Sequence, residues 1–190
     1  MRITGGSFCS RKLEAPAGGR TRPTSDRVRE SLFAVLGNLL DFDGAHVVDA
    51  FAGTGSLGLE ALSRGAASAT FLEQSRDALR CVEANIRSLG VDARTRVVAG
   101  DAERGVARIT QPVRVAFADP PYALVGTAAF RRFLEAMRAA VPWEAGAFVV
   151  VEHRTGSPPP AVPGLESIDA RSWGDTGVAF ARIVDPPPKS

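Results

Sequence analysis

Apolar and polar positions follow two alternating patterns between residues 46 and 152 of this chain. Short apolar runs of the kind found in buried strands alternate with segments in which apolar residues recur every three or four positions, as on one face of a helix. Because strands and helices alternate, we expect a parallel sheet with helices on both faces. The predicted strands are residues 46–50, 69–73, 95–99, 113–118 and 147–152, and the predicted helices are residues 57–64, 75–89, 102–109 and 130–141.

The pattern changes after the fifth strand. Residues 165–173 and 178–184 have the composition of two further strands, and the turn-forming segment 174–177 leaves no room for a helix between them. We therefore predict an α/β fold with a seven-stranded, mostly parallel sheet and an antiparallel final strand. The domain should cover residues 24–185, and residues 186–190 should form a flexible tail.

The first residues form a separate small unit in this interpretation. Short extended pieces within residues 1–23 are broken by glycine and proline, which favours a basic β-hairpin or arm. A helix should follow at residues 25–40, where Val28, Leu32 and Val35 lie on one apolar stripe. This helix would lead into the sheet.

The composition is that of an ordinary globular protein. Of 190 residues, 45% are hydrophobic and 23% charged, which excludes a disordered or membrane-spanning chain. The first six residues carry a charge but are followed by no apolar stretch, so we expect a cytoplasmic protein without a secretory signal. Cys9 and Cys81 match no metal-ligand spacing, so we expect two reduced thiols and no metal site.

Positive charge is concentrated at the start of the chain. Residues 1–36 carry seven basic and three acidic side chains, whereas the whole chain has a net charge of only +2. A basic arm on a mildly acidic body indicates an anionic partner, although arginines near a terminus are also often merely solvated. The candidate contacts to an anionic partner are Arg2, Arg11, Lys12, Arg20, Arg22, Arg27 and Arg29.

A glycine motif follows the first predicted strand. Gly53, Gly55 and Gly58 match the pattern Gly-x-Gly-x-x-Gly between a strand and a helix, where glycines let the backbone approach a ligand closely. Glu73 ends the next strand, where an acid can accept both hydroxyls of a ribose. This pattern fits NAD as well as S-adenosylmethionine, and glycines at such a turn can also serve packing alone.

Two further acids favour S-adenosylmethionine. Asp49 ends the first strand, where its carboxylate would repel a pyrophosphate and attract an ammonium or sulfonium group. Asp101 follows the third strand, where it can accept from an adenine amine, although it can also simply cap a helix. Three acids at the ends of three successive strands together favour a cofactor site over a set of simple helix caps. Its predicted residues are Asp49, Phe51, Ala52, Gly53, Thr54, Gly55, Glu73, Gln74, Asp101, Ala102 and Asp119.

The segment Asp119-Pro120-Pro121-Tyr122 follows the fourth strand and indicates the reaction. The amine of a nucleobase shares its lone pair with the ring, so two acceptors that hold its N–H bonds would help to free that lone pair for methyl transfer. The Asp119 carboxylate and the Pro120 carbonyl can be those acceptors, and the prolines fix the backbone. Tyr122 offers a ring on which the base can stack. An ordinary Asp-Pro turn is the simpler alternative.

Four segments together resemble the RsmD family: residues 22–33, 49–55, 58–66 and 119–122. The resemblance implies a class I methyltransferase fold, which is Rossmann-like, and transfer of a methyl group from S-adenosylmethionine to the N2 amine of one guanine in bacterial 16S ribosomal RNA. It implies that the arm and the first helix hold small-subunit rRNA or an assembling 30S subunit, and that Asp119, Pro120 and Tyr122 hold the guanine amine. We expect a monomer.

Three alternatives remain open at this point. A DNA adenine-N6 or cytosine-N4 methyltransferase shares the segment 119–122, although the chain has no obvious separate target-recognition domain. The glycine motif alone also fits an NAD-dependent oxidoreductase. A non-catalytic RNA-binding protein with a relic cofactor pocket is a third alternative, which the intact segment 119–122 disfavours.

Overall fold

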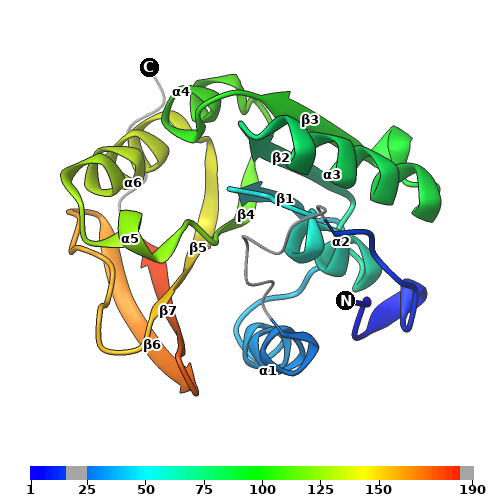
Figure 1. The fold of residues 1–190 in the computed structure, drawn as a ribbon. Helices are drawn as coiled ribbons and strands as arrows, with labels where there is room; N and C mark the ends of the chain where they lie inside the picture. The colour runs from blue at the N-terminus through cyan, green and yellow to red at the C-terminus, as the bar shows by residue number, and fades with distance from the viewer. Residues whose placement is uncertain (16–24, 185–190) are drawn as a thin grey trace.

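A computed structural model describes residues 1–15 and 25–184 of the chain. Seven strands form one sheet in the order β3-β2-β1-β4-β5-β7-β6 (Figure 1). The first five strands in this order are parallel, and β7 is antiparallel to both of its neighbours. The predicted mostly parallel sheet with an antiparallel final strand is confirmed. The strands are β1 (His46–Ala50), β2 (Ser68–Glu73), β3 (Thr95–Ala99), β4 (Val113–Ala118), β5 (Trp143–Arg154), β6 (Leu165–Trp173) and β7 (Thr176–Ile183).

Helices fill the connections between the parallel strands. The predicted helix at residues 25–40 ends at Leu36, because Gly37 and Asn38 are poor helix formers and the chain continues as a series of turns. The predicted helix at residues 102–109 changes into a 3-10 helix after Gly105. The α-helices are α1 (Asp26–Leu36), α2 (Ser56–Ser63), α3 (Arg76–Leu89), α4 (Ala102–Gly105), α5 (Tyr122–Val125) and α6 (Ala128–Ala140), and the 3-10 helices are η1 (Gly6–Phe8), η2 (Asp92–Arg94) and η3 (Val106–Arg108).

The sheet separates two apolar cores. Successive residues of a strand point to opposite faces, so Val47 packs with α1, α2 and α3 whereas Val48 packs with α4 and α6 (Figure 1). Both cores are continuous along the central strands, which are buried on both faces as expected for a parallel sheet. Among the described residues, no helix is both long and apolar enough to cross a membrane.

The arm, residues 1–15, folds back on itself and packs against α2. One antiparallel bridge pairs Arg2 with Lys12, and η1 lies between them. Ile3 and Leu13 are buried in the core that contains α1, α2 and α3. The arm is therefore anchored by apolar side chains, while most of its charged side chains remain at the surface.

Candidate functional site

The carboxyl ends of β2, β1 and β4 bring together the acids that the sequence singles out. Asp49 lies near the end of β1, Glu73 ends β2, and Asp119 directly follows β4. The alternation of side chains places all three on the face of the sheet that α1, α2 and α3 cover. Ligands of an open α/β sheet bind at this edge, beside the point where the strand order reverses, which here lies between β1 and β4.

The loop between β1 and α2 has an unusual backbone. Phe51, Gly53 and Gly55 all have positive φ angles, of 61°, 57° and 76°. A phenylalanine in this region is strained, and such strain is commonly found at functional sites. A side chain at Gly55 or Gly58 would approach Val82 or Phe71 within 2.6 or 2.5 Å, so close packing alone requires these two glycines. A side chain at Gly53 would meet no such obstacle.

Asp49 is buried inside the site, with an exposed fraction of 1%. Its Oδ2 accepts a hydrogen bond of 2.9 Å from the backbone N–H of Gly58 in the first turn of α2. Burial above all, with a further contribution from the charge of Glu73, raises the pKa of Asp49 to about 7, against the lowering effect of the backbone hydrogen bonds. A cation placed next to this carboxyl group would favour its ionised form.

Glu73 fixes the glycine loop relative to the start of α3. Its Oε2 accepts from the N–H of Gly53 at 2.8 Å, and its Oε1 accepts from the N–H groups of Gln74 and Ser75 at 2.8 and 2.7 Å. The carboxylate that we expect to hold a ribose is thus oriented by three backbone donors. Its position at the edge of the loop is therefore defined before any ligand binds.

Asp101 is exposed and caps α4, accepting from the N–H of Arg104 at 3.1 Å. Asp101 therefore caps the helix, as the sequence allowed. Its role as an acceptor for the adenine amine stays a prediction. The remaining residues of the predicted cofactor site differ in exposure: Ala52, Thr54 and Ala102 are buried, Phe51 is half-buried, and Gln74 is exposed.

The segment after β4 carries the predicted target site. Asp119 is half-buried, Pro120 is buried, Pro121 is exposed and precedes α5, and Tyr122 begins that helix. The hydroxyl of Tyr122 donates to Oε1 of Glu152 at 3.1 Å and lies 3.2 Å from Oγ1 of Thr176. The ring that we expect to stack on a base is therefore anchored at its far end. Burial, together with the neighbouring acids, raises the pKa of Tyr122.

The sequence interpretation missed Glu152 and Thr176. Glu152 lies near the end of β5 and is buried, with an exposed fraction of 4%. Its signal was available, because an acid that directly follows a run of apolar residues at a strand end is the same feature that singled out Asp49 and Glu73. Thr176 carried no such signal, because its contact with Tyr122 depends on the pairing of β7 with β5.

Most of the candidate RNA contacts that the structure describes lie at the surface. Arg2, Arg11, Lys12 and Arg27 are exposed, and the Arg11 guanidinium donates to the backbone oxygen of Ser88 at 2.6 Å. Contact of these four side chains with an anionic partner stays a prediction. Arg20 and Arg22 lie outside the described residues.

The prediction for Arg29 is wrong. Its side chain has an exposed fraction of 0% and pairs with Glu60 at 3.3 Å and with Asp26 at 2.8 Å. Glu60 is equally buried and also accepts from the N–H and the hydroxyl of Thr4, at 2.8 and 2.7 Å. Arg29 therefore fastens α1 to α2 and to the arm, and it is not available to a nucleic acid. Its partner lies 31 residues away, so the charge pattern could not reveal this role.

Asn85 of α3 connects the arm with the glycine loop. Its side chain is buried and donates to the backbone oxygens of Thr54 and Glu14, at 2.9 and 3.1 Å. Its Oδ1 accepts from the N–H of Glu14 at 2.7 Å. One amide group therefore holds the loop of the predicted cofactor site and the arm of the predicted RNA site in a fixed relation.

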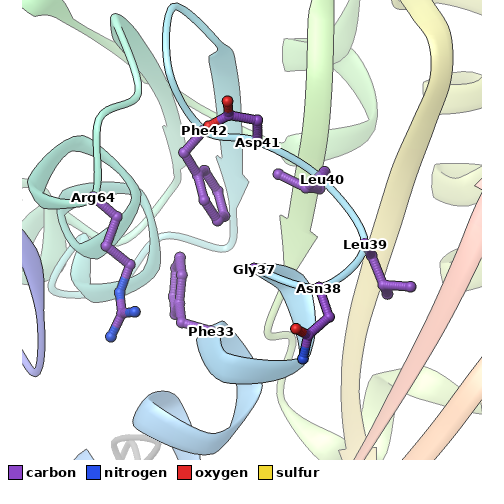
Figure 2. Close-up of a pocket in the computed structure, with 8 residues that line it drawn as sticks. All are labelled: Phe33, Gly37, Asn38, Leu39, Leu40, Asp41, Phe42 and Arg64. Carbon is purple, nitrogen blue, oxygen red and sulfur yellow. The ribbon is translucent and has the colours of Figure 1, made fainter.

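A large open hollow lies elsewhere on the molecule (Figure 2). It has a volume of about 620 Å³ and is bordered by the end of α1, the connection to β1 and Arg64 from the end of α2. The Arg64 guanidinium lies over the ring of Phe33, 5.1 Å from its centroid. The hollow shares no residue with the predicted site, so its size does not mark the chemistry. Within the described residues, no group of three or more potential ligands can hold a metal ion.

Comparison with known proteins shows which family the chain belongs to. A family described as Conserved hypothetical protein 95 matches residues 1–182. The Bacillus subtilis protein YlbH, whose name gives rRNA methylation as its proposed activity, is 37% identical over 184 residues, which cover 95% of this chain and 97% of YlbH. The chain belongs to the RsmD family. The family membership that the sequence motifs predicted is thereby confirmed.

Further relatives of this RsmD family member are known by function and by structure. Ribosomal RNA small subunit methyltransferase D of Escherichia coli is 42% identical over 122 residues, which cover 64% of this chain and 60% of that protein. The structure of the Escherichia coli protein yhhF, named as a candidate methyltransferase, superimposes with a TM-score of 0.82 at 32% identity and covers 96% of this chain and 97% of its own. A hypothetical protein of Thermus thermophilus superimposes with a TM-score of 0.77 at 29% identity, with 96% of this chain and 99% of that protein covered.

Proposed function

We propose that this protein transfers a methyl group from S-adenosylmethionine to the N2 amine of one guanine in bacterial 16S ribosomal RNA. The observation that carries the proposal is the meeting of Asp49, Glu73 and the Asp119–Tyr122 segment at one edge of the sheet, beside the strand reversal. Relatives named as small-subunit rRNA methyltransferases support the substrate. The arm and the exposed Arg27 of α1 would contact small-subunit rRNA or an assembling 30S subunit.

The predicted cofactor residues suit S-adenosylmethionine better than a dinucleotide. A dinucleotide places its pyrophosphate on the N–H groups at the start of the helix after the glycine loop. Here the carboxyl group of Asp49 occupies that position, because it accepts from Gly58 in the first turn of α2. A carboxylate there repels phosphate and attracts a cation. Glu73 would accept from the ribose hydroxyls and Asp101 from the adenine amine.

The residues after β4 would prepare the target amine. S-adenosylmethionine, when bound, supplies an electrophilic methyl group on a sulfonium sulfur. The Asp119 carboxylate and the Pro120 carbonyl would each accept a hydrogen bond from one N–H of the guanine amine. These two hydrogen bonds would direct the lone pair of the amine toward that methyl group. Tyr122, anchored by Glu152 and Thr176, would offer its ring for the base to stack on. Once methylated, the amine would carry a positive charge and one excess proton, which it would release to the Asp119 carboxylate that already accepts one of its hydrogen bonds.

The experiment that tests this function measures radiolabelled methyl transfer to small ribosomal subunits from a strain that lacks the gene. The RNA is digested to nucleosides, which are separated. We expect the label in N2-methylguanosine of the small-subunit RNA, at one position that sequencing can then map. Label in adenine or cytosine of DNA instead would retain the chemistry and reject the substrate. Cofactor binding without transfer to any nucleic acid would reject the catalytic assignment.

A further inference from the structure

Glu152 lies at the target site, but the proposed methyl transfer gives it no contact with the substrate. Ala118 of β4 and Val151 of β5 are partners in the sheet, so the residues that follow them, Asp119 and Glu152, lie next to each other at the edge of the site. Strand alternation directs both side chains to the same face of the sheet. The hydrogen bond from Tyr122 to Glu152 brings this second acid into the target site.

The chemistry of the three amino bases differs next to the amine. In guanine, the ring nitrogen N1, which lies next to the N2 amine on the Watson–Crick edge, carries a hydrogen. This edge therefore presents two neighbouring donors. In adenine and cytosine, the ring nitrogen beside the amine is an acceptor. A carboxylate only accepts hydrogen bonds, so it attracts the guanine edge and repels the other two.

We propose that Glu152 makes the site specific for guanine by accepting the N1–H of the base, while Asp119 and the Pro120 carbonyl hold its N2 amine. The inference rests on the proposed function and supplies the reason for the choice of base. Because Glu152 is buried, an acceptor on the base placed against it would lose its water without gaining a partner. Such a mismatch is expensive, so the side chain rejects adenine and cytosine as well as accepting guanine.

The surroundings of Glu152 suit this role. A carboxylate can accept from more than one donor, and the Tyr122 hydroxyl is one donor to Glu152, at Oε1. The same hydroxyl lies 3.2 Å from Oγ1 of Thr176, so β7 helps to orient it. Glu152 is thereby held on the strand beside Asp119, and both acids can face one edge of a planar base.

The test compares two bases that carry the same amine. Small-subunit RNA is prepared by ligation with either guanine or 2-aminopurine at the mapped position, and is assembled into subunits. 2-Aminopurine retains the 2-amine but has an acceptor in place of N1–H. We expect the wild-type protein to prefer guanine by a factor on the order of 100. If the wild-type protein methylated the two substrates at equal rates, this result alone would overturn the proposal.

Glu152→Gln then exchanges one acceptor oxygen for a donor of the same size. We expect methylation of guanine to fall on the order of 100-fold and the preference over 2-aminopurine to vanish or reverse, because the amide can donate to the ring nitrogen. Glu152→Asp, which keeps only acceptors, should retain the preference at a lower rate. An unchanged preference in Glu152→Gln would overturn the proposal.

Matched controls separate base recognition from other effects. Glu166→Gln makes the same change on an exposed residue of β6 and should leave both rates as in the wild type. Thr176→Val loosens the anchor of Tyr122 and should slow both substrates while the preference for guanine persists. If the wild-type protein labels no guanine in small-subunit RNA, the proposed function fails. If it labels guanine but all variants keep the wild-type preference, only the role of Glu152 fails.

Discussion

The buried carboxyl group of Asp49 links the electrostatics of the site to the proposed cofactor. With a pKa of about 7 instead of 3.8, this group is partly protonated at neutral pH. A sulfonium or ammonium group beside it would lower the pKa again, so binding should release a proton. We therefore expect cofactor affinity to rise between about pH 6 and pH 7.5, and calorimetry in two buffers of different ionisation enthalpy should detect the proton release.

Asp49→Asn is the control for this prediction. It should abolish the proton release and weaken cofactor binding by about 10- to 100-fold. The raised pKa also means that the folded protein binds more protons than the unfolded chain between about pH 4 and 7, so the wild-type stability falls as the pH rises through that window. The Asn variant without ligand should lose this decline. Identical pH profiles of the two proteins would contradict the assignment.

Asp119 tests the target site at the same scale. Asp119→Ala removes one of the two acceptors that we expect to hold the amine, so the rate of methyl transfer should fall by about 10²- to 10³-fold. Cofactor affinity, measured by calorimetry, should change little. Asp92→Ala, at an exposed position in η2, serves as the matched control and should leave the rate unchanged. Full transfer activity in Asp119→Ala would remove this residue from the mechanism.

Single residues differ in how far the sequence reveals them. The placement of Asp49 and Glu73 at neighbouring strand ends could be predicted because each follows an apolar run that marks a buried strand, whereas their role toward a cofactor stays a prediction. Arg29 was misread because its charge resembles that of Arg27, and only the tertiary contact with Glu60 distinguishes the two. The role of Thr176 depends on strand pairing across the molecule, which no local pattern encodes.

At the scale of elements, the central strands β1 and β4 have the predicted bounds, whereas β5 begins at Trp143, four residues before its predicted start, and α1 ends early. A central parallel strand is apolar along its whole length, as in β1 and β4, and its neighbours do not alter that requirement. Helix ends depend on local competition between turn types. The helix predicted to reach residue 40 therefore ends at Leu36, and the four-residue helix α5 was not predicted at all.

Asn85 shows how one element can couple two others, because α3 touches both the glycine loop and the arm through this side chain. Asn85→Ala would remove the hydrogen-bond partner of the buried Thr54 backbone oxygen and of the backbone groups of Glu14 in the arm. We expect a loss of about 1 to 3 kcal/mol in the free energy of unfolding. We also expect weaker cofactor binding and faster proteolysis of the arm, measured by calorimetry and limited digestion.

The matched control for this prediction is Asn38→Ala. Asn38 is exposed and its side chain donates to the backbone oxygen of Ala34 within its own turn, so its loss should affect neither the arm nor the cofactor. Normal cofactor affinity and normal protection of the arm in Asn85→Ala would show that the loop and the arm are held independently of Asn85.

At the scale of the whole molecule, the basic residues near the start of the chain serve two purposes. One part is exposed on the arm and on α1, where Lys12 and Arg27 face solvent. The other part is internal. Arg29 pairs with the buried carboxylate of Glu60, which also accepts hydrogen bonds from Thr4 of the arm. The same basic segment therefore fixes the arm, and we expect its exposed side chains to offer charge to an anionic partner.

These two purposes predict opposite results for neighbouring arginines. Arg27→Gln should weaken RNA binding and reduce the slope of log Kd against log salt by about 1 for each phosphate that the protein no longer binds, with the melting temperature unchanged. Arg29→Gln should instead lower the free energy of unfolding by about 3 to 5 kcal/mol, because it removes the buried cation that faces the carboxylate of Glu60. The salt slope of the folded fraction should then stay as in the wild type. A stable Arg29→Gln protein with a reduced salt slope would mean that Arg29 leaves its buried pair to contact RNA.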